Sequence, residues 1–435
     1  MAKQPKPGAI PPARRMALRA LTMTLGQGRD VQSALDRVLA ESDEADSDRS
    51  LCTELVYGYL RYKGRIDFLL ATRLNAKKPL PARVARTLGL ALYEMLFLTR
   101  IPTYATVNWA VDAVRKDAGS GLAKLANGVL RSLSDFPAGG DDPDLYRNDN
   151  PPLEIFLSRY FSCPKWIVTL WLNSFGRERT EQLLQGSLRR PPVSLRVNMA
   201  RPGHADLLAE LIPGDNCLEA NGSGLALSRL PKNFSEMEQS GRVSRQSLAA
   251  QNALAALAPE TWPTPLLDAC CGRGGKSLFL AEQGYAPIMA SDVNMFRLRG
   301  LLEEQRRLNI HFPTFRASAS APFPLQIMPR TILLDVPCSG LGVLSRRPDS
   351  KWKRTKRDLR DLERIQLEIL NNSWAQLPEG GKIVYLTCTV NVRENEEQVG
   401  AFLKREPGAK LEREFRTPLD SVLGEFFYGA VIRKE

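Results

Sequence analysis

The chain has 435 residues, of which 43% are hydrophobic and 25% charged, a composition typical of a soluble globular protein with two or three domains. No apolar run reaches the roughly 18 residues that a membrane-spanning helix needs, so the sequence excludes such a span. The net charge of +12 favours a polyanionic partner, although a basic surface that only meets solvent would give the same composition.

The N-terminal third of the chain reads as helical. Residues 1–12 are basic and lack the apolar core of a secretory signal, so we expect a flexible lead-in. Apolar residues then recur at helical spacing through residues 13–133, for example at Val84 and Leu88, which predicts an all-α domain. The acidic segment 41–50 is predicted to be a loop. Helical domains serve many functions, so the spacing alone assigns none.

A change in composition marks the next boundary. Residues 134–152 are rich in proline, glycine and aspartate, which predicts a linker. Residues 153–243 begin as a helix and continue into a segment where Val193, Leu195 and Val197 alternate with polar residues, as in a strand. We therefore expect a small α/β domain here.

Residues 244–435 alternate strands with helices, the order expected for a doubly wound α/β domain. Its first strand runs into a glycine-rich turn in LLDACCGRGGK (266–276), where the glycines allow a ligand to reach free amides of the next helix. Asp292 closes the following strand, a position from which a carboxylate can bind ribose hydroxyls. A glycine turn that binds no ligand can have the same sequence, so this pattern alone is weak evidence for a ligand site.

Two cysteine motifs give the stronger signal. TILLDVPCSG (331–340) is an apolar strand followed by Asp335 and Cys338, and GGKIVYLTCT (380–389) is a strand followed by Cys388. A single cysteine is more often a buried apolar residue. Two at the carboxyl ends of parallel strands would lie at the sheet edge where α/β proteins bind ligands, which favours a reactive cleft. Seven scattered cysteines and two histidines fit a reducing cytoplasm and argue against a metal centre.

The segment 346–360 contains eight lysines and arginines together with Trp352. A charge run is usually a solvated face. Because this one directly follows the first cysteine motif and includes an aromatic ring, we expect contact with RNA phosphates and stacking of a base on Trp352.

DACCGRGGK, DVPCSG, RRPDSKW and YLTCTVNVRENEEQ resemble the successive motifs of the RNA cytosine-5 methyltransferases of the NOL1/NOP2/Sun family, over about residues 150–435. The resemblance implies a Rossmann-like methyltransferase domain and an RRM-like small domain, in which Arg196 and Asn198 are either nearest the RNA or on a solvent-facing strand side. It also implies S-adenosylmethionine as cofactor, held by Cys270, Cys271, Gly272, Arg273, Gly274, Gly275, Lys276, Asp292, Ser318 and Asp335.

The chemistry of this family explains the paired thiols. C5 of cytosine is a weak nucleophile, and a thiolate that adds at C6 makes C5 enamine-like. The resemblance assigns this attack to Cys388, contact with the base near N3 to Asp335, and assistance in breaking down the adduct to Cys338. The target base must leave its stack, which favours a single-stranded or loop site.

Two positions depart from the family pattern. The family usually has Ala-Pro before Gly-Gly, where this chain has Gly272 and Arg273. It commonly has an aspartate near the adenine amino group, where Ser318 is the best match. A hydroxyl accepts a weaker hydrogen bond than a carboxylate, so we expect weaker cofactor binding than is usual in the family.

The helical domain resembles the NusB-type RNA-binding domain, notably in IPTYATVNWAVDAVRK (101–116) and LANGVLR (125–131), although a purely structural helical domain is the alternative. The pair of domains resembles bacterial members of the family that act on small-subunit (16S) ribosomal RNA. The resemblance thus implies an enzyme that methylates C5 of a cytidine in 16S rRNA through a covalent cysteine–C6 adduct. From the composition we expect a cytoplasmic protein with no membrane or metal partner; a monomer is expected, and the sequence leaves the oligomeric state open. A tRNA methyltransferase and a catalytically impaired RNA-binding ribosome assembly factor remain the alternatives.

Overall fold

The computed structural model describes residues 10–74 and 78–435, so most of the predicted lead-in lies outside the described residues. The chain forms two compact units: one ends at Arg189 and also takes in Arg347–Lys353, and the other comprises Arg190–Arg346 and Arg354–Glu435. None of the described helices is long and apolar enough to cross a bilayer.

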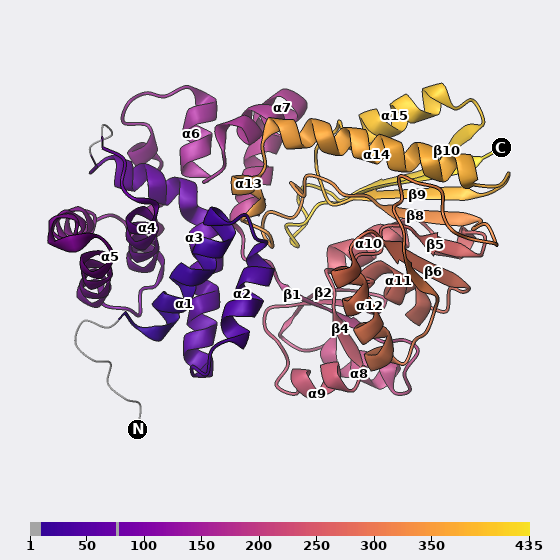
Figure 1. The fold of residues 1–435 in the computed structure, drawn as a ribbon, viewed down its shortest axis with the longest axis horizontal. Helices are drawn as coiled ribbons and strands as arrows, with labels where there is room; N and C mark the ends of the chain where they lie inside the picture. The colour runs from indigo at the N-terminus through magenta and orange to yellow at the C-terminus, as the bar shows by residue number, and fades with distance from the viewer. Residues whose placement is uncertain (1–9, 75–77) are drawn as a thin grey trace. The chain divides into compact units, whose positions relative to one another are not determined.

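The first unit is entirely helical where it is described, which confirms the all-α prediction (Figure 1). Glu94 is buried in this unit and holds its helices together, because its carboxylate accepts hydrogen bonds from Arg14 Nε at 2.8 Å and from Trp109 Nε1 at 3.0 Å. The helices are α1 (Pro12–Leu21), η1 (Thr22–Gly26), α2 (Val31–Ala40), α3 (Asp46–Ala71), α4 (Ala82–Phe97), α5 (Thr103–Ser132), η2 (Ala138–Gly140), η3 (Pro143–Tyr146), α6 (Leu153–Tyr160), α7 (Lys165–Leu188) and α13 (Ser350–Lys353).

The predicted loop at 41–50 is shorter in the structure, because α3 already begins at Asp46. Asp46 and Asp48 lie in the first turn of this helix, where the exposed N–H groups and the helix dipole stabilise negative charge. The acidic residues that suggested a loop therefore start a helix.

The segment 134–152, predicted as a linker, is folded onto the first unit. Tyr146 is fully buried and donates a hydrogen bond from its hydroxyl to the Gly140 carbonyl at 2.9 Å. The next helix, α6, is held to α3 by Arg65, which donates to the Tyr160 carbonyl at 3.0 and 2.7 Å. The helices expected to open the small domain at residue 153 thus belong to the first unit, and the second begins at Arg190.

The small domain opens the second unit. Its order is β1 (Val193–Val197), α8 (His204–Leu211), β2 (Cys217–Asn221), β3 (Gly224–Leu227), α9 (Phe234–Gln239) and β4 (Val243–Arg245). The strands form an antiparallel sheet in the order β2-β3-β1-β4, the arrangement of a ferredoxin-like βαββαβ domain. Its core is formed by Leu195, Val197, Leu207, Leu225, Leu227, Phe234, Met237 and Val243.

The larger domain of the second unit has a seven-stranded sheet in the order β10-β11-β9-β8-β5-β6-β7. Strands β5 to β9 are parallel, as predicted for a doubly wound sheet, whereas β10 and β11 add an antiparallel edge. The elements are α10 (Leu248–Ala256), η4 (Pro259–Thr261), β5 (Leu266–Asp268), α11 (Gly275–Glu282), β6 (Ile288–Asp292), α12 (Met295–Leu308), β7 (Thr314–Arg316), β8 (Thr331–Asp335), α14 (Lys356–Gln376), β9 (Lys382–Thr387), α15 (Glu396–Arg405), β10 (Ala409–Arg416) and β11 (Tyr428–Lys434).

The strand order reverses direction between β5 and β8. From β5 the chain moves outward through β6 to β7, and then returns to place β8 and β9 on the other side of β5. In such sheets ligands bind outside the carboxyl ends of the strands at this switch point. The topology therefore locates the site at the ends of β5, β8 and their neighbours.

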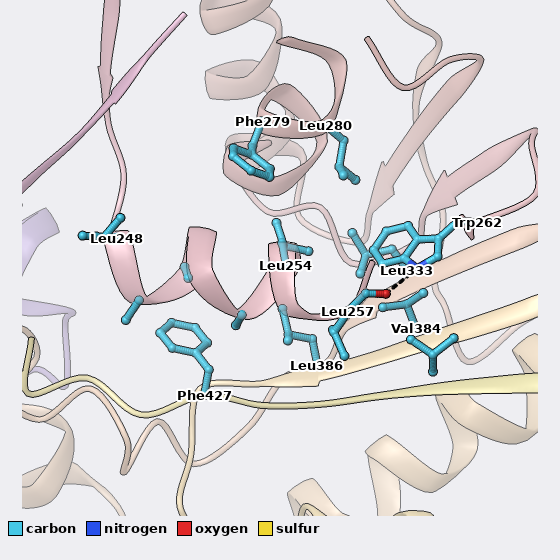
Figure 2. Close-up of a cluster of buried hydrophobic side chains, with 14 of the residues drawn as sticks. Leu248, Leu254, Leu257, Trp262, Phe279, Leu280, Leu333, Val384, Leu386 and Phe427 are labelled. Atoms are coloured by element: carbon cyan, nitrogen blue, oxygen red, sulfur yellow. Dashed lines mark hydrogen bonds between the residues drawn. The ribbon is translucent and has the colours of Figure 1, made fainter. Parts of the chain in front are cut away.

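Apolar side chains cover both faces of the sheet. This packing holds the strands in place and therefore also positions their carboxyl ends. Figure 2 shows α10 packed over one face, where Leu254 and Leu257 lie among Leu333, Val384 and other sheet residues. The indole of Trp262 closes this cluster and donates to the Leu257 carbonyl at 2.9 Å. Helices α14 and α15 contribute Ile369, Leu370, Trp374, Val399 and Phe402 to the core on the other face.

Candidate active site

The glycine turn between β5 and α11 forms as predicted. Gly272 and Gly274 adopt φ values of +57° and +81°, which residues with a Cβ rarely do. A Cβ on Gly274 would also lie 2.1 Å from Leu301 Cδ1, so a larger residue would force the Leu301 side chain to move. The turn is tied to the next strand, because the Gly272 N–H donates to Asp292 Oδ2 at 2.9 Å. Asp292 thus ends β6 beside the glycine turn, where the sequence predicted it.

Asp268 also stabilises the turn, and the sequence reasoning did not single it out. It ends β5, is fully buried, and accepts a hydrogen bond from Ser277 Oγ at 2.5 Å. Burial raises the pKa of Asp268 to about 7, and the Ser277 hydrogen bond only partly offsets this. An acidic residue directly after an apolar strand was the available signal for this role.

Lys276 and Asp335 form an ion pair at the same edge. Lys276 Nζ lies 2.5 Å from Asp335 Oδ2, so the first helical turn of α11 is joined to the end of β8. Burial opposes the charge of Lys276, but Asp335 and Cys388 outweigh burial and raise its pKa above the usual value. The side chain of Lys276 therefore lies with the predicted catalytic residues, while its backbone belongs to the predicted cofactor turn.

The two cysteines meet at the ends of adjacent parallel strands. Cys338 follows β8, Cys388 follows β9, and their Sγ atoms are 3.3 Å apart. Both side chains are partly buried, and neither forms a disulfide. The pKa of the Cys338 thiol lies well above its usual value, because of its hydrogen bond with Cys388 and then because of burial. If each cysteine were only a buried apolar residue, nothing would predict that the two thiols lie in contact beside an ion pair.

The remaining predicted cofactor residues surround this edge. Cys271 is buried and Cys270 partly so, and burial raises the pKa of both thiols, which makes them poor nucleophiles. Arg273 is exposed, with its guanidinium against Gly300 and 5.9 Å from the centre of the Phe296 ring. Ser318 is exposed two residues beyond the end of β7, so it also lies at the carboxyl edge.

Arg196 and Asn198 are neither solvent-facing nor free to meet RNA. Arg196 is 2% exposed and pairs with Glu282 at 2.6 and 2.7 Å, while its third nitrogen donates to Gln246 and to the Gly275 carbonyl. Asn198 is 1% exposed and donates to the Gly241 carbonyl at 3.0 Å. Both alternatives drawn from the sequence are thus wrong, because the second face of β1 is buried too.

The prediction for Trp352 is also wrong. The indole donates to the Leu60 carbonyl at 2.7 Å, and a Cβ on Gly64 would lie 3.0 Å from the ring, so Trp352 packs on α3. Lys351 is fully buried and donates to the Arg61 carbonyl at 2.9 Å. Of the basic segment, the exposed residues that remain for an anionic partner are Arg347, Lys356, Arg357 and Arg360.

No group of three or more histidine, cysteine or acidic side chains is placed to bind a metal ion within residues 10–74 and 78–435. The polar groups at the sheet edge instead comprise two thiols, an ammonium–carboxylate pair and a glycine turn with a strand-end aspartate. This set is suited to covalent catalysis on a substrate held beside a nucleotide-like ligand.

Comparison with known proteins identifies the class. Residues 254–426 match the family described as 16S rRNA methyltransferase RsmB/F, residues 11–135 match the NusB family, and residues 163–222 match the ferredoxin-like domain of RsmF/B-like methyltransferases. The chain therefore contains a Rossmann-like methyltransferase domain and a ferredoxin-like companion domain, and the family match of the companion begins within the first unit, at residue 163.

Whole-chain relatives define the family. The chain is 32% identical to a probable ribosomal RNA small subunit methyltransferase B of Bacillus subtilis, over 91% of this chain and 88% of the relative. It is 30% identical to ribosomal RNA small subunit methyltransferase B of Proteus mirabilis, over 97% and 98%. The chain belongs to the RsmB/F family of ribosomal RNA small-subunit methyltransferases, with a NusB-like N-terminal domain.

Solved structures agree on the fold. The crystallised protein PH0851 is 20% identical and superposes with a TM-score of 0.76 over 98% of this chain and 99% of that protein. A methyltransferase homologue from Pyrococcus horikoshii, 23% identical, superposes with a TM-score of 0.56 over 66% of this chain and all of that protein. At these identities the likeness supports the fold alone.

Proposed function

We propose that this methyltransferase transfers a methyl group from S-adenosylmethionine to C5 of a cytidine in 16S ribosomal RNA, through a covalent adduct between Cys388 and C6. The observation that carries the proposal is the pair of thiols, 3.3 Å apart at the ends of β8 and β9, beside the Lys276–Asp335 ion pair. Methylation at a nitrogen or a hydroxyl needs no thiol nucleophile, whereas methylation at C5 of a pyrimidine requires a nucleophile that first adds at C6.

The residues at the edge suit S-adenosylmethionine, which supplies an electrophilic methyl group when it is bound. Backbone amides of the glycine turn and of the start of α11 offer donors, and Asp292 offers a carboxylate for ribose hydroxyls at the end of β6. A Cβ built on Gly272 would meet nothing within 4 Å, so the space beside the turn is open. Cys270, Cys271 and Arg273 line the same turn by their place in the chain.

The reaction uses the residues in a fixed order. Cys388 attacks as its thiolate: Sγ bonds to C6, the C5–C6 π electrons move to C5, and C5 would then bond to the methyl group that S-adenosylmethionine would supply. Asp335 is placed to stabilise the charge or proton at N3, and Lys276 orients that carboxylate. The C5 proton is lost to solvent, its bonding electrons re-form the C5–C6 double bond, and the electrons of the Sγ–C6 bond return to Cys388 as a thiolate. Cys338, whose sulfur is 3.3 Å away, assists this release.

The helical unit supports RNA as the substrate, because it belongs to the NusB family and the chain carries a net charge of +12. We assign RNA recognition to this unit and catalysis to the second, since the two reactive thiols lie in the second. A tRNA substrate and a catalytically impaired assembly factor are the competing functions; the departures at Arg273 and Ser318 favour the latter, whereas the paired thiols argue against it.

Bisulfite mapping tests the function. Ribosomal RNA and tRNA from a deletion strain, and from the same strain carrying the restored gene, are compared for 5-methylcytosine. We expect one 16S rRNA cytidine to regain protection in the restored strain and to stay unprotected with a Cys388→Ala gene. Restoration in tRNA alone would assign the competing substrate, and restoration nowhere would support the assembly factor.

Ser318 provides a separate test of the cofactor site. We expect Ser318→Asp to bind S-adenosylmethionine about fivefold more tightly than wild type, because a charged acceptor strengthens a hydrogen bond to the adenine amino group by about 1 kcal/mol. Calorimetric titration of both proteins measures this difference. Ser320→Asp, which adds the same charge two residues further on, is the control and should bind as wild type does. Equal affinity in wild type and Ser318→Asp would remove Ser318 from the site.

A further inference from the structure

A buried carboxylate, that of Glu394, lies in the turn between β9 and α15, which also carries Cys388. Glu394 is fully buried although it belongs to the acidic run ENEE, whose neighbours Glu396 and Glu397 are partly or fully exposed. Nothing in the reaction described above uses Glu394. A buried carboxylate is costly unless its oxygens are hydrogen-bonded, so its partners indicate what it does.

Glu394 contacts the loop that carries Cys338. Its Oε2 accepts a hydrogen bond from the backbone N–H of Ser339 at 2.8 Å, one residue after that cysteine. The same oxygen accepts from Gln366 Nε2 at 2.9 Å, and Gln366 also donates to the Pro337 carbonyl at 2.9 Å. The residues on both sides of Cys338 are therefore fixed by one carboxylate and its amide partner.

Glu394 also contacts the turn that carries Cys388. Its Oε1 accepts from Asn391 Nδ2 at 3.0 Å, and its own carbonyl accepts from the Tyr385 hydroxyl at 2.7 Å. A second tie joins the two loops directly, because the hydroxyl oxygens of Ser339 and Thr389 are 2.8 Å apart. One buried carboxylate thus links the backbone of the Cys338 loop to the Asn391 side chain of the turn that carries Cys388.

The charges around the two sulfurs differ. The negative charge of Glu394 contributes to the raised pKa of Cys338, after the Cys388 hydrogen bond, burial and the charge of Cys388. Cys388 instead interacts with the ammonium of Lys276. An anion favours a thiol over a thiolate, so Glu394 disfavours the thiolate form of Cys338.

We propose that Glu394 is a positioning residue that holds the Cys338 loop against the Cys388 turn and so sets the spacing of the two sulfurs for attack and release. This inference rests on the proposed function for the attack itself. The hydrogen bonds of Ser339, Gln366 and Asn391 to the carboxylate are the contacts that set the spacing.

The test replaces Glu394 by its neutral isostere. In Glu394→Gln the new amide group faces donors that need an acceptor, and the negative charge is gone. We expect kcat for RNA methylation to fall on the order of 10- to 100-fold, because small displacements of reacting groups have effects of this size. The KM for RNA and the Kd for S-adenosylmethionine should change less than about twofold, since Glu394 touches neither site.

A second measurement reads the thiols without RNA or cofactor. Wild type and Glu394→Gln are alkylated with iodoacetamide across a pH series, and mass spectrometry separates the peptides of Cys338 and Cys388. We expect Cys338 to become reactive at lower pH in the variant, because an anion that favours its thiol form has been removed. A role in packing alone would leave this pH profile where it is in wild type.

Two further variants complete the design. Glu363→Gln removes a half-buried carboxylate that pairs with Arg393 at 2.8 Å, and it should keep wild-type turnover and the wild-type thiol profile. Glu394→Asp keeps the charge but shortens the side chain, so turnover should fall while the Cys338 profile stays in place. This variant carries the test if Glu394→Gln does not fold.

The proposal is overturned if Glu394→Gln has wild-type kcat and an unchanged Cys338 profile. It is also overturned if Glu363→Gln loses turnover to the same extent, or if Glu394→Asp keeps full turnover. Absence of 5-methylcytosine with the wild-type protein on every RNA would instead overturn the proposed function. The alkylation profile does not depend on RNA, so the electrostatic effect of Glu394 is measured in either case.

Discussion

Cys388→Ala is expected to abolish methylation and to form no covalent complex with RNA, because no other thiol lies at the end of β9 to attack C6. Cys338→Ala leaves the attacking sulfur in place but removes its neighbour 3.3 Å away, so a protein–RNA adduct should accumulate after methyl transfer. Denaturing gel electrophoresis with labelled RNA and S-adenosylmethionine distinguishes the two variants.

Cys52→Ala is the matched control for these substitutions. Cys52 is a fully buried free cysteine of α3, and losing its sulfur should cost stability on the order of 1 to 2 kcal/mol with normal turnover and no adduct. The same behaviour in all three variants would reduce Cys338 and Cys388 to packing residues. An adduct that persists in Cys388→Ala and is absent from Cys338→Ala would reverse the two roles.

The sheet edge that carries the candidate active site was predictable because its sequence signals are local. Asp292, Asp335 and Cys388 each directly end or follow an apolar run that forms a strand, and parallel strands bring their carboxyl ends to one side of the sheet. The glycine turn has the same property, since the required φ values select glycine at known offsets. Local pattern and general topology together were sufficient to group these residues.

Burial by distant elements was not predictable. Apolar and polar residues alternate in Val193–Val197, which indicates that one face of the strand is buried. The same alternation predicts that Arg196 lies on a solvent-exposed face. The buried ion-pair partner of Arg196, Glu282, lies 86 positions later, and no spacing rule connects the two residues. Trp352 fails for the same reason, because its partner Leu60 lies 292 positions away.

Glu394 shows the limit of composition. In the run ENEEQ three carboxylates look alike, and a helix start rich in glutamate is normally exposed. Only the fold reveals that Glu396 and Glu397 occupy the first turn of α15 while Glu394 turns inward toward Ser339. Side-chain direction at a strand-to-helix turn depends on backbone geometry that single-sequence patterns do not contain.

Arg196→Met is expected to destabilise the second unit by about 3 to 5 kcal/mol, because it leaves the buried carboxylate of Glu282 without its cation. Both side chains are 2% exposed or less, and the pair is bidentate. Arg196 also donates to the Gly275 carbonyl at 2.9 Å, so the glycine turn should loosen and the Kd for S-adenosylmethionine should rise. Differential scanning calorimetry and cofactor titration measure the two effects.

The pH dependence separates lost charge pairing from lost packing. Burial raises the pKa of Glu282 above its usual value, and Arg196 opposes that rise, so the pKa climbs further in Arg196→Met. The folded variant then keeps a proton that the unfolded chain releases, and its stability falls as pH increases from the unfolded pKa to the folded one. The loss in free energy of unfolding relative to wild type should therefore be larger at pH 8 than at pH 5.

The double variant Arg196→Met, Glu282→Leu removes the carboxylate that has lost its cation. It should recover stability and lose the pH-dependent deficit in free energy of unfolding. A deficit that is equal at both pH values and persists in the double variant would show that Arg196 acts through its packing alone.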